Sequence, residues 1–270
     1  MPLGTDVDNP AGLIERAKAL LPDAKEVSLI EFLEGGWSNR NYRIAIDGNE
    51  AVLRVKNQMF DDSPGENLYL ANPLAPRLLA YDKTSGDMIT EFVEGELLVN
   101  SPIDPATAAN YMLELHQHIP QKIRVYDVQK VIATYLKGLQ MKVDLQQIYD
   151  GLDWQPENIC GCHNELNDWN VIKTDTGFCT LDWESAGDHD PIFDVIGLCY
   201  GLEFNDTQFR KCIKIYDSNV KPLHVRTTRI LYQIREHAWA LDRLRHGSKH
   251  DGILKQKIDT EAEILRLAAY

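Results

Sequence analysis

The spacing of apolar residues changes along the chain, and this change limits the folds that the sequence can adopt. Residues 11–22 follow a helical spacing, but the runs after them alternate apolar and polar side chains, as strands do. The turn Asp47-Gly48-Asn49 predicts a hairpin between two of these runs. Predicted strands occupy residues 26–35, 41–47, 50–56, 77–82 and 87–93, with a short helix around residues 66–70.

Helical patterns dominate the sequence after Gly95. The first of these helices starts with Asp104 as its N-cap and Pro105 at its first position. A strand–turn–strand segment at residues 170–183 interrupts the helical run. The predicted helices occupy residues 104–119, 127–147, 191–203, 206–217, 222–246 and 255–268. We therefore predict an α+β chain with a five-stranded antiparallel β lobe at residues 1–95 and a mainly helical lobe at residues 96–270.

The charge balance restricts the class of partner. Asp and Glu number 41 against 28 Lys and Arg, which gives a net charge of −13. Nucleic-acid binding requires clustered basic residues, so we expect a small-molecule partner instead. The acidic excess suits a cationic substrate, although it could equally serve solubility alone.

The cysteines and the N-terminal residues indicate the cellular compartment in which we expect the protein. The five cysteines are an odd number, the first residues are polar and acidic, and no apolar run has the length of a membrane span. We expect a cytoplasmic protein with reduced thiols and no membrane partner. The segment Cys160-Gly161-Cys162-His163 has no second ligand pair, so a zinc site there is not favoured.

The segment CHNELNDWN, residues 162–170, carries the strongest chemical signal. Its spacing from His163 to Glu165 to Asn170 matches the catalytic loop of kinases, H-x-D-x-x-x-x-N, except that glutamate replaces aspartate. Twelve residues after Asn170, and after the predicted hairpin, comes Asp182. The hairpin should return Asp182 to Asn170, so that the oxygens of both reach Mg2+, while Glu165 orients an acceptor hydroxyl.

Two further segments could contact the phosphates of a nucleotide. Gly35 and Gly36 in the turn between the first two strands permit close backbone approach, although an ordinary hairpin turn is the alternative. On the third strand, Arg54 occupies the position of the lysine in a V-A-I-K strand, with Lys56 as the second choice and a solvent-facing strand edge as the alternative. Glu66 could pair with Arg54, or could simply be solvated.

The segment at residues 90–95 would connect the two lobes. Backbone groups around Glu91, Phe92 and Val93 could bind an adenine edge, which leaves no side-chain signature. Neither D-F-G nor A-P-E follows Asp182, so a protein kinase is not favoured.

Taken together, these segments resemble the choline/ethanolamine kinase-like branch of the aminoglycoside phosphotransferase superfamily, whose members have a bilobal protein kinase-like fold. The similar segments are GGWSNRNYRI, VLRV, ITEFVEG, CHNELNDWNVI and LDWESAGDHDPIFDV, spread from about residue 30 to residue 200 in the family's order. The resemblance implies an ATP- and Mg2+-dependent kinase that phosphorylates a hydroxyl, with nucleotide bound in the β lobe.

The resemblance also assigns roles to residues. It implies that Asp190 and Asp194 brace the catalytic loop and that His163 belongs to the scaffold. Glu165 stands where the family has its catalytic aspartate. The implied ATP and metal contacts are Gly35, Gly36, Ser38, Asn39 and Arg54 for the phosphates, and Asn170 and Asp182 for Mg2+.

Glu165 leaves three accounts open. The acceptor could sit deeper so that glutamate works, the enzyme could be slow, or the chain could be a nucleotide-binding pseudoenzyme. Because the carboxylate and the metal pair are retained, we favour an active enzyme.

The acceptor pocket is expected to combine aromatic faces with carboxylates, as a cationic amine requires. Glu236 and Trp239 share one face of the helix at residues 222–246, and core packing is the alternative for Trp239 and Tyr200. The candidate acceptor contacts are Trp169, Glu184, Tyr200, Glu236 and Trp239. A choline- or ethanolamine-like acceptor is favoured, with an aminoglycoside or thiamine as alternatives. The oligomeric state is not predicted.

Overall fold

The computed structural model describes residues 9–33, 39–56 and 66–269. The chain divides into two compact units. The first comprises Met1–Ser101 with Trp169–Glu184, and the second comprises Pro102–Asp168 with Ser185–Tyr270. The first is built on strands and the second on helices, which confirms the predicted α+β class.

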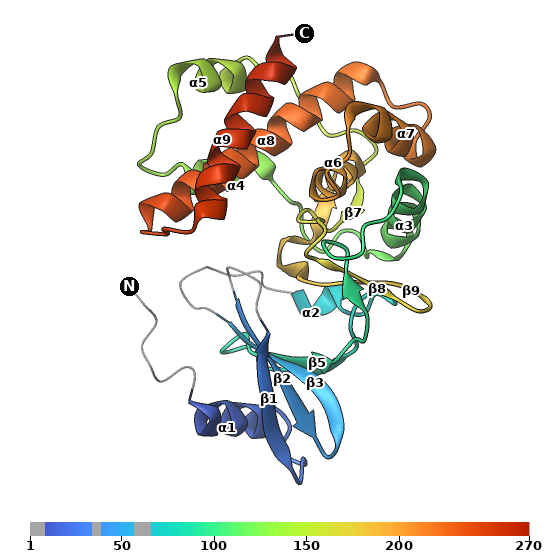
Figure 1. Ribbon diagram of the computed structural model, residues 1–270, viewed down its shortest axis with the longest axis vertical. Helices are drawn as coiled ribbons and strands as arrows, with labels where there is room; N and C mark the ends of the chain where they lie inside the picture. Colours follow the sequence, from blue (N-terminus) through green and yellow to red (C-terminus); the bar gives the residue numbers. More distant parts are fainter. Residues whose placement is uncertain (1–8, 34–38, 57–65, 270) are drawn as a thin grey trace. The chain divides into compact units, whose positions relative to one another are not determined.

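The first unit contains the predicted five-stranded antiparallel sheet (Figure 1). Its strands lie in the order β1-β2-β3-β5-β4, so β5 inserts between β3 and β4. Each prediction from the period-two pattern is confirmed to within a few residues. The bounds are β1 Val27–Leu33, β2 Asn39–Ile46, β3 Asn49–Lys56, β4 Leu78–Tyr81 and β5 Met88–Glu91.

One helix packs on this sheet and buries its apolar residues. Helix α1 (Pro10–Leu20) begins with Asn9 as its N-cap and places Leu13 and Ala17 in the core. The sheet contributes Tyr42, Ile44, Leu53, Val55 and Ile89 to the same core. The short helix α2 (Glu66–Tyr69) precedes β4.

A second, smaller sheet contains the hairpin that precedes Asp182 and joins this hairpin to the first unit. Strands β8 (Val171–Thr174) and β9 (Gly177–Thr180) form the predicted hairpin, and β6 (Glu96–Leu97) pairs with β8. Gly95 adopts φ 151°, and a Cβ there would lie 2.3 Å from the carbonyl oxygen of Lys173, so only glycine allows this approach. The structure thus groups residues 96–101 and the hairpin with the sheet, whereas the sequence pattern assigned them to the helical lobe.

The second unit is mainly helical, as predicted. Helix α6 is almost fully buried. Helix α8 packs against α9, and Figure 1 shows the two helices side by side. The helices are α3 Pro105–His118, α4 Val128–Tyr135, α5 Val143–Asp150, α6 Pro191–Gly201, α7 Asp206–Tyr216, α8 Pro222–Arg245 and α9 Asp251–Ala268. The predicted single run at residues 127–147 is wrong, because the chain leaves the helix before Gly138, which adopts a left-handed φ of 75°.

Two short strands flank the catalytic loop within the second unit. Strand β7 (Cys160–Cys162) pairs antiparallel with β10 (Gly187–His189), so the loop starts from a fixed edge. A Cβ at Gly161 would meet the backbone of Ile119 at 2.7 Å, which explains the glycine between the two cysteines. All five cysteines are free.

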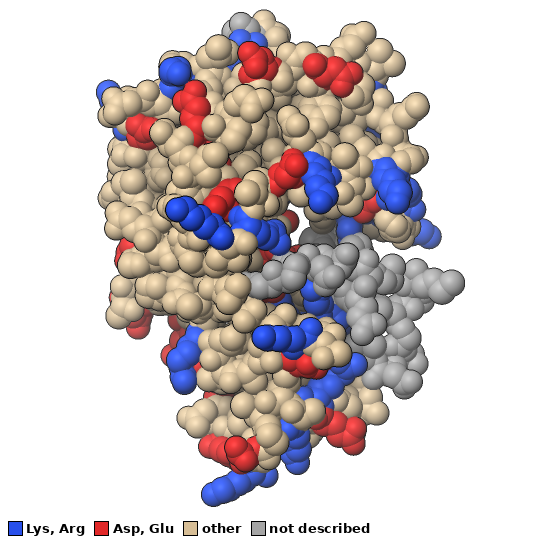
Figure 2. All heavy atoms as spheres, turned by 180° about the vertical axis from the view of Figure 1, so that it is seen from behind, with Lys and Arg blue, Asp and Glu red and all other residues tan. Residues whose placement is uncertain are grey.

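Charged side chains are interspersed on the face of the molecule in Figure 2, with Lys and Arg beside Asp and Glu. On that face the net charge of −13 does not gather into one large acidic field. Within the described ranges, no helix combines the length and the apolar character needed to cross a membrane.

His189 occupies an aromatic environment beneath the loop. Its ring lies 5.1 Å from that of Tyr126, 5.6 Å from Trp154 and 4.8 Å from Phe193. Among the described residues, neither ring nitrogen has a hydrogen-bond partner, and burial lowers the pKa of His189 to about 4. The folded state therefore holds the neutral imidazole.

This burial predicts a pH-dependent loss of stability. Because the unfolded histidine has a pKa near ~6.5, the contribution of His189 is complete above that value and is lost as the pH falls toward about 4. The loss amounts to at most ~3 kcal/mol over this window. The unfolding midpoint of the wild type should therefore fall more steeply between these pH values than that of His189→Phe or His189→Leu.

The exposed His118 provides a matched control. His118→Gln should keep the steep wild-type slope, because His118 is exposed and the burial that acts on His189 does not act on it. Parallel slopes for wild type and both His189 variants would contradict the prediction.

Candidate active site

The candidate site of the first unit is a cavity of about 390 Å3 between the five-stranded sheet and the catalytic hairpin. Apolar side chains, among them Val52, Met88 and Leu181, supply part of its walls. Nine of the residues predicted for the site line it: Asn39, Arg54, Glu66, Glu91, Phe92, Val93, Trp169, Asn170 and Asp182. Apolar walls with a few convergent polar groups are typical of a small-molecule site.

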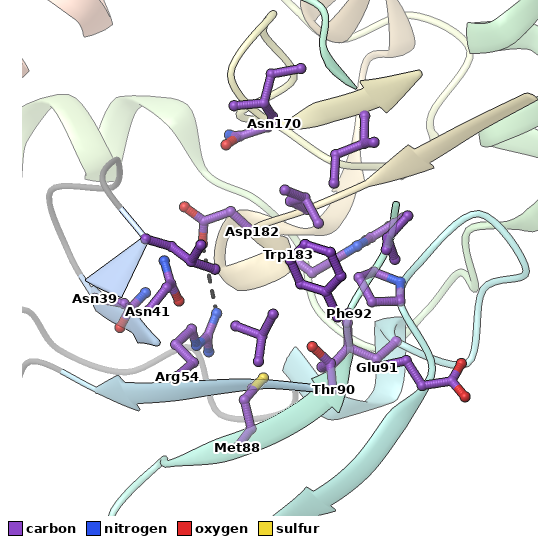
Figure 3. A pocket seen from close by; sticks show the side chains of 18 of the residues that line it. Asn39, Asn41, Arg54, Met88, Thr90, Glu91, Phe92, Asn170, Asp182 and Trp183 are labelled. Carbon is purple, nitrogen blue, oxygen red and sulfur yellow. Dashed lines mark ion pairs between the residues drawn. The ribbon is translucent and has the colours of Figure 1, made fainter. Parts of the chain in front are cut away.

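Arg54 is the central cation of this cavity. Its guanidinium forms a two-nitrogen salt bridge with the carboxylate of Glu66, and its Nη1 lies 3.8 Å from Asp182 Oδ1. Figure 3 shows the side chains of Arg54 and Asp182 pointing toward one another. The side chains of Arg54 and Glu66 are only 11% and 4% exposed, so the pair is buried. The structure therefore forms the Arg54–Glu66 pair that the sequence had suggested, and adds a contact with Asp182 that the sequence had not.

The environment keeps Arg54 charged. Burial alone would lower its pKa, but the carboxylate of Glu66, and then those of Asp182 and Glu184, raise it above the ordinary value. A fixed planar cation at the wall of a cavity suits an anionic ligand with paired oxygens, such as a phosphate. Lys56, the second choice from the sequence, is not among the residues that line the cavity.

The hairpin positions the two predicted metal ligands. Leu181 N–H donates to the Asn170 carbonyl at 2.8 Å, which closes the hairpin and sets Asp182 one residue beyond this pairing. Asp182 adopts a left-handed φ of 61°, a strained conformation that is often found at functional sites. Asn170 and Asp182 both line the cavity (Figure 3).

The donor set at this end fits a hard divalent cation. A carboxylate oxygen of Asp182 lies within 4.8 Å of one from Glu184, and Asn170 lines the same cavity as Asp182. Carboxylate and amide oxygens are the ligands that Mg2+ prefers. Asn39 Nδ2 donates to Glu184 Oε2 at 3.2 Å, so Glu184 is tied to strand β2.

The turn that was predicted to contact the phosphates falls mostly outside the described residues. Gly35, Gly36 and Ser38 belong to this part of the chain, and Asn39 is the first described residue after it. Asn39 is 8% exposed and lines the cavity.

The segment after β5 reaches the cavity with its backbone already partly engaged. Glu91 N–H donates to the carbonyl of Arg77 at 2.9 Å, and Phe92 N–H donates to the carbonyl of Glu50 at 3.4 Å. The side chain of Glu91 forms a salt bridge with Arg77. The N–H groups of Glu91 and Phe92 are therefore already used. The backbone carbonyl groups of this segment and the N–H of Val93 are better placed to form hydrogen bonds with a base.

In the second unit, Asp194 fixes the start of the catalytic loop. Its carboxylate accepts from His163 N–H at 2.7 Å and from Asn164 N–H at 2.6 Å. His116 Nε2 lies 3.0 Å from the same carboxylate. Burial would raise the pKa of Asp194, but His116 and these donors lower it, so the carboxylate stays ionised.

The neighbouring Asp190 holds a different segment. It caps α6 through Ile192 N–H, accepts from Glu157 N–H at 2.7 Å and lies 2.7 Å from His224 Nε2. Both aspartates thus bind groups within the second unit. His116, Cys162 and Asp194 have ligand atoms within 4.8 Å, but Asp194 already accepts two backbone amides, which leaves this group better suited to bracing than to holding a metal.

Glu165 lies beside a buried arginine that the sequence analysis did not single out. Arg235 Nη1 lies 3.7 Å from Glu165 Oε1, and its Nη2 lies 2.7 Å from Glu236 Oε1. Arg235 also donates to the carbonyl of Asn164 at 3.2 Å. A charged residue among the apolar positions of α8 was the available signal, since a buried cation requires an anionic partner.

The remaining acceptor candidates have contrasting surroundings. Tyr200 is tightly packed: its hydroxyl donates to Glu263 Oε1 at 2.7 Å and accepts from Arg229 Nε at 3.0 Å, and its ring stacks on Tyr232. Trp239 is half-buried, with the Arg243 guanidinium 5.7 Å from its ring centroid. Trp169 belongs to the first unit and is 55% exposed. Core packing therefore explains the presence of Tyr200. Trp169 and Trp239 are the aromatic candidates that could still contact a ligand.

Comparison with known proteins gives a family match over most of the chain. A model of the phosphotransferase enzyme family matches residues 29–217. The curated protein LicA of Haemophilus influenzae is 25% identical over 186 residues, which cover 60% of this chain and 55% of that protein. The chain thus spans about half the length of this curated relative.

Solved structures agree with the fold. A crystal structure of LicA in complex with AMP has a TM-score of 0.79 at 16% identity, covering 98% of this chain and 100% of the other. The choline kinase LicA from Streptococcus pneumoniae has a TM-score of 0.78 at 17% identity, covering 96% and 99%. These similarities confirm the predicted protein kinase-like fold.

The buried pair of Arg54 and Glu66 generates a prediction about stability. Glu66→Gln should lower the free energy of unfolding by about 3 kcal/mol, because it leaves the Arg54 charge buried without its main partner. The double variant Arg54→Met/Glu66→Leu should recover most of this loss, since it removes both charges. Chemical denaturation of the three variants measures these differences.

The exposed pair of Arg77 and Glu91, in the same unit, is the matched control. Glu91→Gln should cost less than about 1 kcal/mol, because both side chains are well exposed. A double variant that is less stable than Glu66→Gln would show that the two charges stabilise the fold beyond their mutual pairing.

Proposed function

The chain belongs to the phosphotransferase enzyme family, and we propose that it is an ATP-dependent kinase that phosphorylates the hydroxyl of a small cationic acceptor. A choline- or ethanolamine-like amino alcohol is the favoured acceptor. One observation carries the proposal: Arg54, held by Glu66, faces Asp182 in a cavity that Asn170 also lines. A cation suited to phosphate and two residues with metal-type ligand atoms thus line one cavity.

The first unit binds the nucleotide in this proposal. The adenine lies against the apolar walls near Val93, and Arg54 holds the phosphates. By the resemblance to the family, Gly35, Gly36, Ser38 and Asn39 would contact the phosphates; of these four, Asn39 is the one that the structure describes. Asn170 and Asp182 would hold Mg2+, which when bound neutralises negative charge on the β- and γ-phosphate oxygens.

Glu165 acts on the acceptor. Its carboxylate accepts a hydrogen bond from the acceptor hydroxyl and takes the proton as the oxygen attacks the γ-phosphorus. The bond between the γ-phosphorus and the bridging oxygen of ADP breaks as the new P–O bond forms, so ADP carries away the bonding pair. Asn170 follows Glu165 by five positions, the spacing of the kinase loop.

Glu236 and Trp239 are the proposed contacts of the cationic group. They lie three residues apart on α8, so a carboxylate and an aromatic face are presented by neighbouring positions on one helix. Trp169 and Glu184 are further candidates. A relative described as a choline kinase supports this acceptor class.

The three alternatives are of two kinds, a different cationic acceptor or a protein without catalysis. An aminoglycoside is a polycation and would suit the same carboxylates, and thiamine is a third cationic candidate. A nucleotide-binding pseudoenzyme is the alternative from another class, because glutamate at position 165 adds one methylene to the expected aspartate. Location in the cytoplasm remains part of the proposal, consistent with five free thiols.

Turnover of purified protein tests the roles of the carboxylates. With ATP, Mg2+ and a panel of choline, ethanolamine, thiamine and an aminoglycoside, Glu165→Gln should lower kcat on the order of a hundredfold, because it removes the proton acceptor. Asp182→Asn should lower kcat by a similar factor and raise the Mg2+ concentration required. Release of ADP and phosphorylation of the acceptor are both measured.

Asp175 supplies the control, since it is an exposed carboxylate in the turn of the same hairpin. Asp175→Asn should leave turnover unchanged. Full activity of Glu165→Gln would refute its role as a base, and nucleotide binding without turnover on any acceptor would favour the pseudoenzyme.

A further inference from the structure

Glutamate in place of aspartate raises a positional problem. The longer side chain has one more rotatable bond, so its carboxylate can occupy more positions, and a displacement of about 1 Å at a reacting group can cost on the order of a hundredfold in rate. A working glutamate therefore requires a group that selects one of these positions.

We propose that Arg235 is the positioning residue that holds the Glu165 carboxylate for phosphoryl transfer. This inference rests on the proposed function. The contact joins Arg235 Nη1 to one carboxylate oxygen, Glu165 Oε1, at 3.7 Å. Arg235 reaches Glu165 from α8, seventy positions further along the chain, and both residues belong to the second unit.

Arg235 controls the backbone of the loop as well as the side chain. Its Nη1 donates to the carbonyl of Asn164, the residue directly before Glu165, at 3.2 Å. Asn164 adopts a left-handed φ of 68°, and its side-chain amide donates to the carbonyls of Ser185 and Gly187. Arg235 Nη1 thus contacts both the carbonyl of the peptide bond before Glu165, which sets the direction of the Glu165 side chain, and the Glu165 carboxylate.

The guanidinium is itself held rigidly. Its Nη2 pairs with Glu236 Oε1 at 2.7 Å, and Gln256 Nε2 donates to the other oxygen of Glu236 at 2.8 Å. Its Cζ lies 5.3 Å from the ring centroid of Phe193 and 5.1 Å from that of Tyr232. With a side chain only 4% exposed, Arg235 has little freedom to move, which a positioning group requires.

The planar fork of arginine is essential to this arrangement. A lysine ammonium is a single point charge and could satisfy Glu236, but could not reach Glu236, the Asn164 carbonyl and Glu165 at once. Arg235→Lys therefore keeps a cation in the buried site, which favours folding, while removing the positioning contact. Aspartate at position 165 is one methylene shorter and would end before Arg235.

A double-mutant cycle in kcat tests the proposal. With ATP, Mg2+ and choline as the acceptor, Arg235→Lys should lower kcat by about tenfold to a hundredfold while the KM for ATP changes by less than about twofold. In the Glu165→Asp background, the same Arg235→Lys change should lower kcat by less than about threefold, because the contact it removes is already absent. Glu165→Asp alone should also lower kcat.

Arg226→Lys is the matched control, since Arg226 lies on the same helix and donates to the carbonyl of Leu267 near the end of α9. It should leave kcat unchanged. Thermal unfolding of all variants accompanies the kinetics, and Arg235→Lys and Glu165→Gln should shift the midpoint non-additively when combined.

The outcomes separate the two proposals. Full kcat in Arg235→Lys, an equal loss in both backgrounds, or additive shifts in the unfolding midpoint would overturn the positioning role and leave the kinase proposal standing. A wild-type protein that binds ADP but phosphorylates none of choline, ethanolamine, thiamine or an aminoglycoside would overturn the proposed function, and the positioning role with it.

Discussion

A buried arginine that must be paired is the constraint on which the candidate site depends. Arg54 projects from the third strand into a region where its side chain is 11% exposed, and a charge in that environment is stable only with a carboxylate beside it. Glu66 supplies that carboxylate, and Asp182 Oδ1 lies 3.8 Å from Nη1 of the same guanidinium. The Arg54 guanidinium thus pairs β3 with α2 through Glu66, and the same guanidinium lines the cavity where a phosphate could bind.

The second unit repeats this arrangement around a different carboxylate. Arg235 is buried, is paired with Glu236 and lies beside Glu165, much as Arg54 is paired with Glu66 and lies beside Asp182. In each unit one glutamate balances the buried charge. A second carboxylate, on a strained loop or hairpin, lies 3.7 or 3.8 Å from a nitrogen of the same guanidinium. Asn164 and Asp182, both in left-handed conformations, mark these two places.

The sequence predicted the first unit well because its signals are local. Alternating residues and the turn at Gly48 define the strands, and the spacing from Asn170 to Asp182 fits one hairpin, whose pairing the structure confirms. The grouping of residues 96–101 and of the hairpin with the sheet was not predictable in this way, since it depends on pairing between β6 and β8 across many residues. The break at Gly138 was missed because the amphipathic pattern continues on both sides of it.

The side-chain partners were harder to predict than the elements. Arg54 and Glu66 were suggested as a pair because Glu66 lies on the short helix that follows the Arg54 strand. Arg235 belongs to no motif, and its contacts with Asn164 and Glu165 span about seventy positions of sequence. Tyr200 shows the opposite case. It was a candidate contact of the acceptor, but its ring stacks on Tyr232 and its hydroxyl donates to Glu263. Periodicity assigns a residue to a face but does not identify its partner across the core.

The central claim is that this chain moves the γ-phosphate of ATP to a hydroxyl of a small cation. Phosphorus NMR of a mixture of purified protein, ATP, Mg2+ and choline follows both products in one sample. The account predicts that ADP and a phosphomonoester of choline appear in equal amounts. ADP and inorganic phosphate without any phosphomonoester, from choline or from the other cationic alcohols, would contradict it.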